Sequence, residues 1–303
     1  FGSTEFHVAR AGEDLDARYL LHFLRQDWVR YAGERRMTGS GGQRRVPRQF
    51  LEQLPIAKPP LPEQRRIAAI LDQADALRRL RRQSLARLSD LGQAIFFEMF
   101  GSGSEDSNIA LTPLASAAKL INGDRSSNYP SGEDLVDDGI LFLSTRNIVD
   151  GGIDFSHRQF ITMDKFNSLG GGKLARGDVV ITLRGSTGLS AVFDTEYETG
   201  FINAQLMIIR CNDRLLPQYL QKYLSLPSTQ HRLKKEGSGS AVPQLTGAQM
   251  KEFKILVPPI DQQLAFIEAY ADLQDHVSNA ILGSRQLDYL FASLQHRAFR
   301  GEL

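Results

Sequence analysis

The feature that most constrains this sequence is an internal repeat, in which the C-terminal part matches the N-terminal part at an offset of about 199 residues. The matches pair Phe1 with Phe201, Phe6 with Leu206, Val8 with Ile208, Tyr19 with Tyr219, Pro59 with Pro258, Gln64 with Gln263, and Phe100 with Phe299. A duplicated unit either reads its target twice or holds two like objects at a fixed separation. The repeat therefore decides the architecture before any single motif is considered.

Each copy ends in a long segment with helical spacing, Glu63–Phe100 in the first copy and Asp261–Phe299 in the second. The second segment carries a heptad seam at Phe266, Tyr270, Leu273, Val277, Ala280, Ser284, Leu287, Phe291, Leu294 and Ala298. The first segment gives Ile67, Leu71, Ala74, Arg78, Arg81, Leu85, Leu88, Gly92, Ile95 and Met99, so two arginines interrupt it. A lone seam would expose a large apolar stripe, so we predict an antiparallel helix pair. The alternative is that each helix packs on its own domain.

Short apolar runs separated by Gly, Asp and Asn turns follow the first long segment and predict an α/β domain. The predicted strands are Leu141–Leu143, Val179–Leu183, Ala191–Phe193 and Phe201–Ile209, and the predicted helices are Asp16–Tyr31, Pro217–Leu226 and Gln230–Lys235. We expect an α+β protein with parts at 1–60, 61–101, 102–110, 111–258 and 259–303. The segment Leu111–Gly200 has no counterpart before Phe1, which we attribute to truncation, permutation or an upstream half on another chain.

Bulk properties limit the possible functions. The net charge of +1 gives no global attraction for nucleic acid, so a nucleic-acid surface requires local clustering. A single cysteine, Cys211, leaves no internal disulfide or cysteine metal cluster. No apolar run approaches the ~20 residues that span a bilayer, and we expect a soluble, cytoplasmic protein. The six histidines lack metal-ligand spacing, and we predict no catalytic residue and no metal site.

Two clusters that follow apolar runs have the residue types that read DNA bases. The turn 184–188 offers Arg184, Ser186 and Thr187, and arginine can donate two parallel hydrogen bonds to guanine. The alternative is a simple β-turn with a solvated arginine. The stretch Thr145, Arg146 and Asn147 adds an asparagine that can pair with adenine, or that merely caps the chain.

The third cluster is a glycine-serine loop with polar and basic flanks, and it occurs in both copies. Its candidate residues are Ser40, Gln43, Arg44 and Arg45 in the first copy, and Lys234, Lys235, Ser238, Ser240 and Gln244 in the second. Basic side chains would neutralise phosphates, while serine hydroxyls and backbone amides would position the duplex. The alternative is a flexible, solvated loop.

Two junctions resemble a known family. Leu54–Ile67 and Ile255–Gln263 both resemble the junction between a target recognition domain and a conserved helix in specificity subunits of type I restriction-modification systems. The turn 184–188, the stretch Ile202–Gln205 and the Gly-Ser-Gly loops also lie where that family has them, which adds Gln205 to the DNA-binding candidates.

The resemblance implies a non-catalytic subunit of a DNA adenine methyltransferase complex, in which each recognition domain reads one half of a bipartite double-stranded DNA site. The long helices would space the halves and dock two modification subunits that carry S-adenosylmethionine. Restriction subunits that use ATP and Mg could join, and a half-type chain could self-associate. Arg78 and Arg81 would then face a partner. The competing hypotheses are a coiled-coil scaffold or protein-binding adaptor, and an enzyme with an unrecognised site.

Overall fold

The computed structural model describes residues 6–39, 44–101, 109–124, 128–237 and 244–303, apart from the side chain of Ser89. The chain forms two compact units, the first made of Phe1–Arg87 with His276–Leu303 and the second of Leu88–Asp275. Each unit therefore contains part of both long helices, α4 (Leu61–Phe100) and α9 (Ile260–Ala298).

The second unit contains two main sheets among its described residues. One has the strand order β10-β9-β12-β2 and the other β3-β7-β4-β11-β8, with short pairs β1-β13 and β5-β6 beside them. The strands are β1 (Leu111–Pro113), β2 (Ala118–Asn122), β3 (Leu135–Val136), β4 (Ile140–Leu143), β5 (Ile148–Val149), β6 (Gly152–Ile153), β7 (Phe160–Ile161), β8 (Lys173–Ala175), β9 (Val179–Thr182), β10 (Ser190–Val192), β11 (Thr199–Ile202), β12 (Leu206–Cys211) and β13 (Lys254–Leu256). The helices are α5 (Met163–Ser168), α6 (Pro217–Ser225), α7 (Pro227–Glu236) and α8 (Gly247–Glu252), with single 3-10 turns at Leu114–Ser116, Gly132–Asp134 and Thr145–Asn147.

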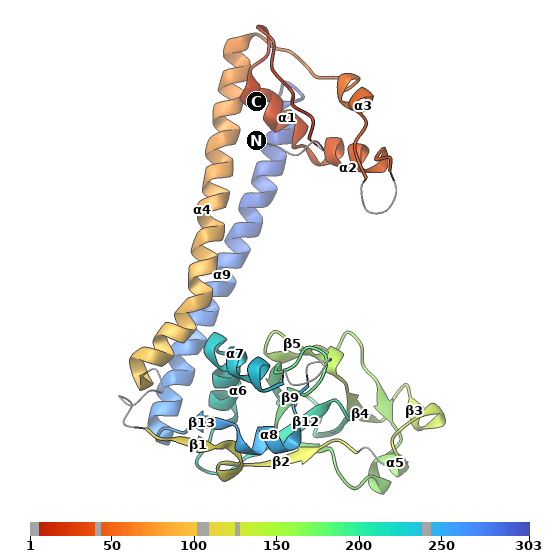
Figure 1. Cartoon of the computed structure of the whole chain (residues 1–303), viewed down its shortest axis with the longest axis vertical. Coiled ribbons are helices and arrows are strands. Elements are labelled where there is room, and N and C mark those ends of the chain that lie inside the picture. The colour runs from red at the N-terminus through yellow and green to blue at the C-terminus, as the bar shows by residue number, and fades with distance from the viewer. Residues whose placement is uncertain (1–5, 40–43, 102–108, 125–127, 238–243) are drawn as a thin grey trace. The chain divides into compact units, whose positions relative to one another are not determined.

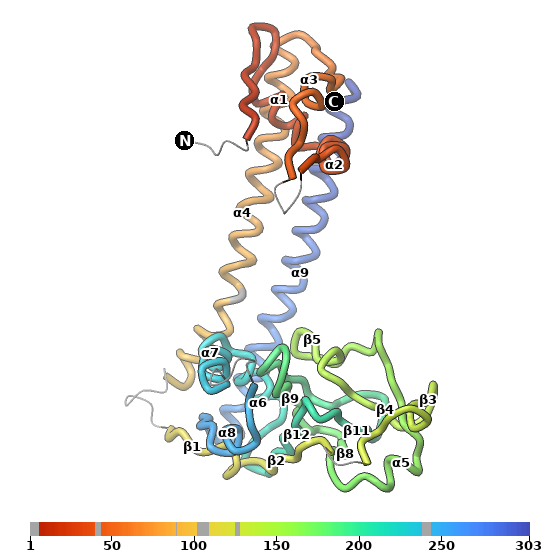
Figure 2. Tube along the Cα trace, turned by 45° about the vertical axis from the view of Figure 1, so that its right-hand side comes forward, coloured from red at the N-terminus to blue at the C-terminus, as the bar shows by residue number. Residues whose placement is uncertain are grey.

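The four-stranded sheet separates two hydrophobic cores, because alternate residues of a strand point to opposite faces. Met207 and Ile209 of β12 face the core that contains α6 and the ends of the long helices, whereas Leu206 and Ile208 face the core shared with the five-stranded sheet. All four residues are fully buried. Figures 1 and 2 show α6 and α7 on the side nearest α4 and α9, and β3 at the far side of the unit.

The predicted strand Phe201–Ile209 is divided in the structure into β11 and β12, which belong to different sheets. Asn203 makes the break: its side-chain oxygen accepts a hydrogen bond from the Gln205 amide at 3.0 Å, and its carbonyl accepts one from the Leu206 amide at 3.1 Å. Asparagine favours such local turns over a continuous ladder. This short connection carries the chain from one sheet to the other.

The first unit contains α1 (Ala17–Leu24), α2 (Asp27–Arg35) and α3 (Arg48–Glu52) beside the two long helices. The prediction of one helix over Asp16–Tyr31 was wrong, because Gln26 is extended and buried and its side-chain amide donates to the Phe23 carbonyl at 3.3 Å. In the second copy Pro227 marks the equivalent break between α6 and α7. No proline marks it in the first copy.

The two long helices pair antiparallel, as predicted, and the α+β architecture is confirmed. In the first unit Leu71 of α4 and Phe291 of α9 share one buried cluster. In the second unit the ring of Phe96 lies 5.6 Å from that of Phe266. The start of each helix therefore meets the end of the other. The seam departs from the prediction at Met99, which is exposed, while Phe96 and Phe100 are buried in its place.

Arg78 and Arg81 face the sister helix, so the expectation that they face a partner was wrong. The Arg78 Nε atom lies 2.6 Å from Oδ1 of Asp288, and its guanidinium lies 4.2 Å from the ring centre of Phe291. Arg81 packs over Gly283, where an added Cβ would lie 3.1 Å from the arginine. Both arginines lie on α4, and α9 accommodates them inside the seam with Gly283 beside Arg81 and the ring of Phe291 under Arg78.

Burial raises the pKa of the partly buried Cys211 thiol to about 12, so the thiol stays protonated and unreactive near neutral pH. Within the described ranges, no helix combines the length and the apolar character that crossing a lipid bilayer requires.

The Arg78–Asp288 pair predicts a measurable, pH-dependent coupling between the helices. The hydrogen bond from Arg78 is the main cause that lowers the pKa of Asp288, so the stabilisation is present above the unfolded-state pKa of about 3.9 and is lost as the pH falls through the lower folded-state pKa. Because Asp288 is 41% exposed, solvent screening limits the coupling to about 0.5–1 kcal/mol. Urea unfolding of Arg78→Met, Asp288→Asn and the double variant measures it at pH 7 and at lower pH.

Arg79 provides the matched control, because it is exposed and has no ion-pair partner among the described residues. Arg79→Met combined with Asp288→Asn should show additive effects. A zero coupling for Arg78 at pH 7, or a coupling that does not weaken in acid, would contradict the assigned contact.

Candidate nucleic-acid interface

The candidate interface is an edge of the second unit where several strands end together. The Asn203 amide donates to the Leu143 carbonyl at 2.8 Å, the Leu183 amide donates to the Gln205 carbonyl at 2.8 Å, and the Leu245 amide donates to the Leu183 carbonyl at 2.8 Å. These bonds join the ends of β4, β9 and β11 to the segment that enters α8. They bring three of the predicted sequence clusters to one edge of the unit.

Three long polar side chains lie along this edge. Arg184 follows β9 and forms an isolated antiparallel bridge with Gln244, while Gln205 precedes β12. Arg184 and Gln205 are exposed, and Gln244 is partly buried. The Arg184 guanidinium has no hydrogen-bonding or ion-pair partner in the described part of the chain. An exposed arginine and two amides can each form the paired hydrogen bonds that distinguish bases in the major groove.

The turn between β9 and β10 is held in a fixed shape by buried contacts. Its glycines Gly185 and Gly188 have φ values of 78° and 90°, which favour glycine. The hydroxyl of buried Thr182 donates to the Ser186 carbonyl at 2.5 Å and accepts from the Leu189 amide at 3.0 Å. Ser186 is exposed on this turn, whereas Thr187 is only 9% exposed. Ser186 therefore remains a contact candidate, and Thr187 contributes mainly to the shape of the turn.

The C-terminal end of α7 lies beside the same turn. Ser186, Lys234 and Gly237 are among the residues that line a shared hollow of about 440 Å³. Gln230 of α7 donates to the Gly188 carbonyl at 2.8 Å and to the Leu224 carbonyl at 2.6 Å, which fixes the helix against the turn. An exposed ammonium beside an exposed hydroxyl suits a phosphate group. Lys235 is also exposed on the last turn of α7.

The glycine-serine loops are only partly within the described residues. Ser40, Gln43, Ser238 and Ser240 lie outside them. The base of the second loop is closed by the Gln244 amide, which donates to the Gly237 carbonyl at 3.1 Å. The base of the first loop is closed by two bonds between Thr38 and Arg45, at 2.9 and 2.8 Å. Arg44 and Arg45 are both exposed at this base.

Asn147 holds its own loop together from a buried position, so the prediction that it reads a base was wrong. Its side chain is 2% exposed. Its oxygen accepts from the Ser144 amide and hydroxyl at 2.9 and 3.0 Å, and its nitrogen donates to the carbonyls of Asp154 and His157 at 3.0 and 3.2 Å. These bonds leave the amide no free hydrogen-bonding group. Thr145 is partly exposed and Arg146 is exposed beside it.

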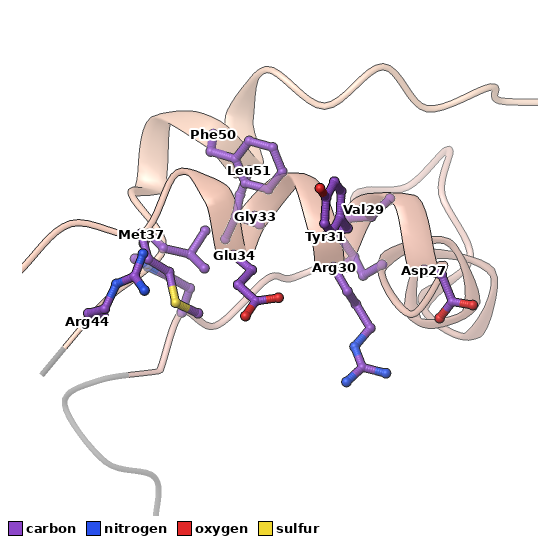
Figure 3. Close-up of a pocket in the computed structure, with 13 residues that line it drawn as sticks. Asp27, Val29, Arg30, Tyr31, Gly33, Glu34, Met37, Arg44, Phe50 and Leu51 are labelled. Carbon is purple, nitrogen blue, oxygen red and sulfur yellow. The ribbon is translucent and has the colours of Figure 1, made fainter. Parts of the chain in front are cut away.

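The first unit has a hollow where the second has packed strands. Figure 3 shows this pocket of about 800 Å³ along α2 and α3, with Met37 and Arg44 at one end and Asp27 at the other. Gly33 lines this pocket, and the residue that matches it in the repeat, Leu233, is buried in the second unit. The described part of the first unit contains no counterpart of β9 and β10. Phe6 and Val8 are consequently 71% and 80% exposed, although their mates Leu206 and Ile208 are buried.

Sequence reasoning missed Gln230 and Thr182, the two side chains that fix the turn between β9 and β10. Thr182 ends an apolar run and Gln230 lies on a polar helix face, so neither has a distinctive motif. Their roles come from the packing of α7 on the hairpin, which spacing along the chain does not reveal. No group of three or more His, Cys, Asp or Glu residues in the described ranges is arranged to hold a metal.

Comparison with known proteins assigns the fold and the family. A family model described as "Type I restriction modification DNA specificity domain" matches residues 1–89 and 139–279. The chain therefore belongs to the family of type I restriction modification DNA specificity domains. Two solved structures share the fold at 21% sequence identity: the HsdS subunit from Thermoanaerobacter tengcongensis, with a TM-score of 0.56, and a chain from "Structural basis underlying complex assembly and conformational transition of the type I R-M system", with a TM-score of 0.68. They cover 96% and 94% of this chain, which covers 72% and 71% of theirs.

Curated relatives match shorter stretches. The specificity subunit of the type I restriction enzyme EcoAI from Escherichia coli is 41% identical over 110 residues, which are 36% of this chain and 18% of that protein. The EcoBI specificity subunit, also from Escherichia coli, is 26% identical over 194 residues, which are 61% of this chain and 40% of that protein. The chain thus matches well under two thirds of the length of these relatives.

The contacts of Asn147 predict a stability defect when it is replaced. Asn147→Ala would leave the Ser144 amide and the Asp154 and His157 carbonyls without their partner, which should cost about 1–3 kcal/mol of unfolding free energy. Arg146→Ala, the adjacent exposed control, should change it by less than about 0.5 kcal/mol. Urea unfolding of the full chain measures both. Equal effects of the two substitutions would refute the structural role of Asn147.

Proposed function

We propose that this chain is the sequence-specific DNA-recognition subunit of a type I restriction-modification complex, and that the strand-end edge of its second unit reads one half of a bipartite site. The observation that carries the proposal is the row formed by Arg184, Gln205 and Gln244. Backbone hydrogen bonds link the three segments that carry these residues. Membership of the DNA specificity family supports double-stranded DNA as the target that this row would read.

In this proposal, base reading and backbone holding belong to different residues. Arg184 offers two parallel donors, and Gln205 and Gln244 each offer a donor and an acceptor, which are the groups that base edges can pair with. Lys234 and Ser186, beside their shared hollow, would hold a phosphate, and Lys235 would add attraction that carries no sequence information. Arg44 and Arg45 would make the corresponding backbone contacts from the first unit.

The chemistry of methylation would then belong to partner subunits. In this proposal two modification subunits carry S-adenosylmethionine, and restriction subunits with ATP and Mg can join them. Exposed apolar side chains on both long helices support docking there: in the first unit they include Leu77 and Leu80 on α4, and Leu282 and Tyr289 on α9, at 56%, 60%, 56% and 78% exposure. Leu77 and Leu80 lie three residues apart, and Leu282 and Tyr289 seven residues apart, so each pair shares one face of its helix. Apolar side chains exposed on one face favour a protein-binding surface. The helices would also space the two half-sites.

The proposal predicts two different defects at one edge. On the assembled complex, Arg184→Ala should lose about 1–3 kcal/mol of discrimination at one or two base pairs of a selected site. Lys234→Ala should weaken binding to all sequences alike. It should also reduce the slope of log K against the logarithm of the salt concentration by about 1. Binding selection at several salt concentrations measures both effects.

Arg176→Ala is the control, since it removes the same charge from a residue that precedes β9, at the opposite end of that strand from Arg184. It should leave base preference unchanged. Unaltered base preference in Arg184→Ala would reject the role of Arg184, and binding that is insensitive to salt would favour the scaffold hypothesis.

A further inference from the structure

A fully buried glutamine lies in the first turn of each long helix. In the first unit, Oε1 of Gln64 accepts from the Asp16 amide at 2.8 Å. Its Nε2 donates to the Asp14 carbonyl at 3.0 Å and to the Pro59 carbonyl at 2.8 Å. Gln64 therefore joins the start of α4 to the segment that leads into α1.

In the second unit, Gln263 makes the same three kinds of hydrogen bond. Oε1 of Gln263 accepts from the Leu216 amide at 2.8 Å, and its Nε2 donates to the carbonyls of Arg214 and Pro258 at 2.8 and 2.7 Å. Both glutamines have 0% exposure. The start of α9 is thus joined to the segment that leads into α6.

These bonds define the orientation of the amide without ambiguity. The oxygen faces an N–H group and the nitrogen faces two carbonyl groups, so a flipped amide would place like groups against each other. Both amide protons and one acceptor position are used in each copy. Glutamate could accept from the N–H but could not donate to the carbonyls, and leucine could do neither.

The segment that Gln263 joins to α9 is connected through packed elements to the strand-end edge. Leu216 is the N-cap residue of α6, and α6 is followed directly by α7, which carries Lys234. Gln221 of α6 donates to the Ser190 carbonyl of β10 at 3.3 Å, next to the hairpin whose turn begins at Arg184. A change in the angle between α9 and α6 would therefore move the strand-end edge relative to the long helix.

We propose that Gln64 and Gln263 are positioning residues that hold each recognition unit at a fixed angle on the helix pair and so restrict the spacer length between the half-sites that the protein accepts. This inference rests on the proposed function. It assigns the glutamines no contact with DNA, and it separates spacer discrimination from base discrimination.

Tyr219 supplies a control for general loss of buried hydrogen bonding. Its hydroxyl donates to the Leu256 carbonyl at 3.1 Å, as the Tyr19 hydroxyl does to the Ala57 carbonyl at 2.9 Å. These bonds tie α6 and α1 to the chain before the prolines and do not involve the helix starts. Tyr219→Phe therefore removes a buried bond of the same unit and leaves the joint intact.

The experiment uses the complete chain in its assembled complex and a DNA library in which selected half-sites are separated by spacers of different lengths. Gln263→Leu and Gln263→Glu should keep the wild-type base preference within each half-site. Their preference for the wild-type spacer over spacers one base pair longer or shorter should fall by about tenfold. Gln64→Leu and Gln64→Glu should do the same through the other joint, and Tyr219→Phe should keep the wild-type spacer preference.

Thermal unfolding identifies which of the four glutamine variants are folded, and each folded variant decides the matter. Wild-type spacer discrimination in a folded variant overturns the inference, and so does a loss of base preference that accompanies the loss of spacer preference. A wild-type complex without any sequence preference would instead overturn the proposed function. The two failures are therefore distinguishable.

Discussion

The structure depends on the burial of the seam between α4 and α9. Neither helix could expose the apolar residues of its seam to water alone, and the antiparallel pairing buries these seam residues within each unit. The start of each helix is joined to its own copy of the repeat, while its end packs on the other copy: the ring of Phe299 lies 4.9 Å from that of Tyr19, and the ring of Phe100 lies 6.1 Å from that of Tyr219. Each copy of the repeat therefore contacts both long helices, so the duplicated sequence and the pairing of the helices depend on each other.

The strand-end edge follows from a second, local constraint. Buried strands end together, and their last backbone groups bond to one another because unpaired groups there would be costly. The side chains just beyond those ends therefore lie next to each other. Arg184 follows β9 and Gln205 precedes β12, the neighbouring strand of the same sheet, and Lys234 reaches this edge from a helix.

The repeat and the helix pair could be predicted because they rest on patterns that persist over many residues. The predicted apolar runs correspond to β4, β9, β10 and, divided, to β11 and β12, whereas the other described strands were not predicted. The prediction of a single helix over Asp16–Tyr31 was wrong because the backbone becomes extended at Gln26, and no proline in the sequence indicates this break. Asn147 looked equally suited to reading adenine or to capping, and only its neighbours in space decide between them. Arg78 interrupted the apolar pattern, yet a carboxylate and an aromatic ring on the sister helix accommodate it.

The most direct test of the account is site-specific photo-crosslinking to DNA in the assembled complex. A photoreactive amino acid would replace Gln205, at the strand-end edge, or Arg176, before the opposite end of β9. We expect crosslinks from position 205 to map within one half of the selected site, and no specific crosslinks from position 176. Crosslinks from position 176 alone, or from neither position while the complex remains bound to its site, would contradict the account.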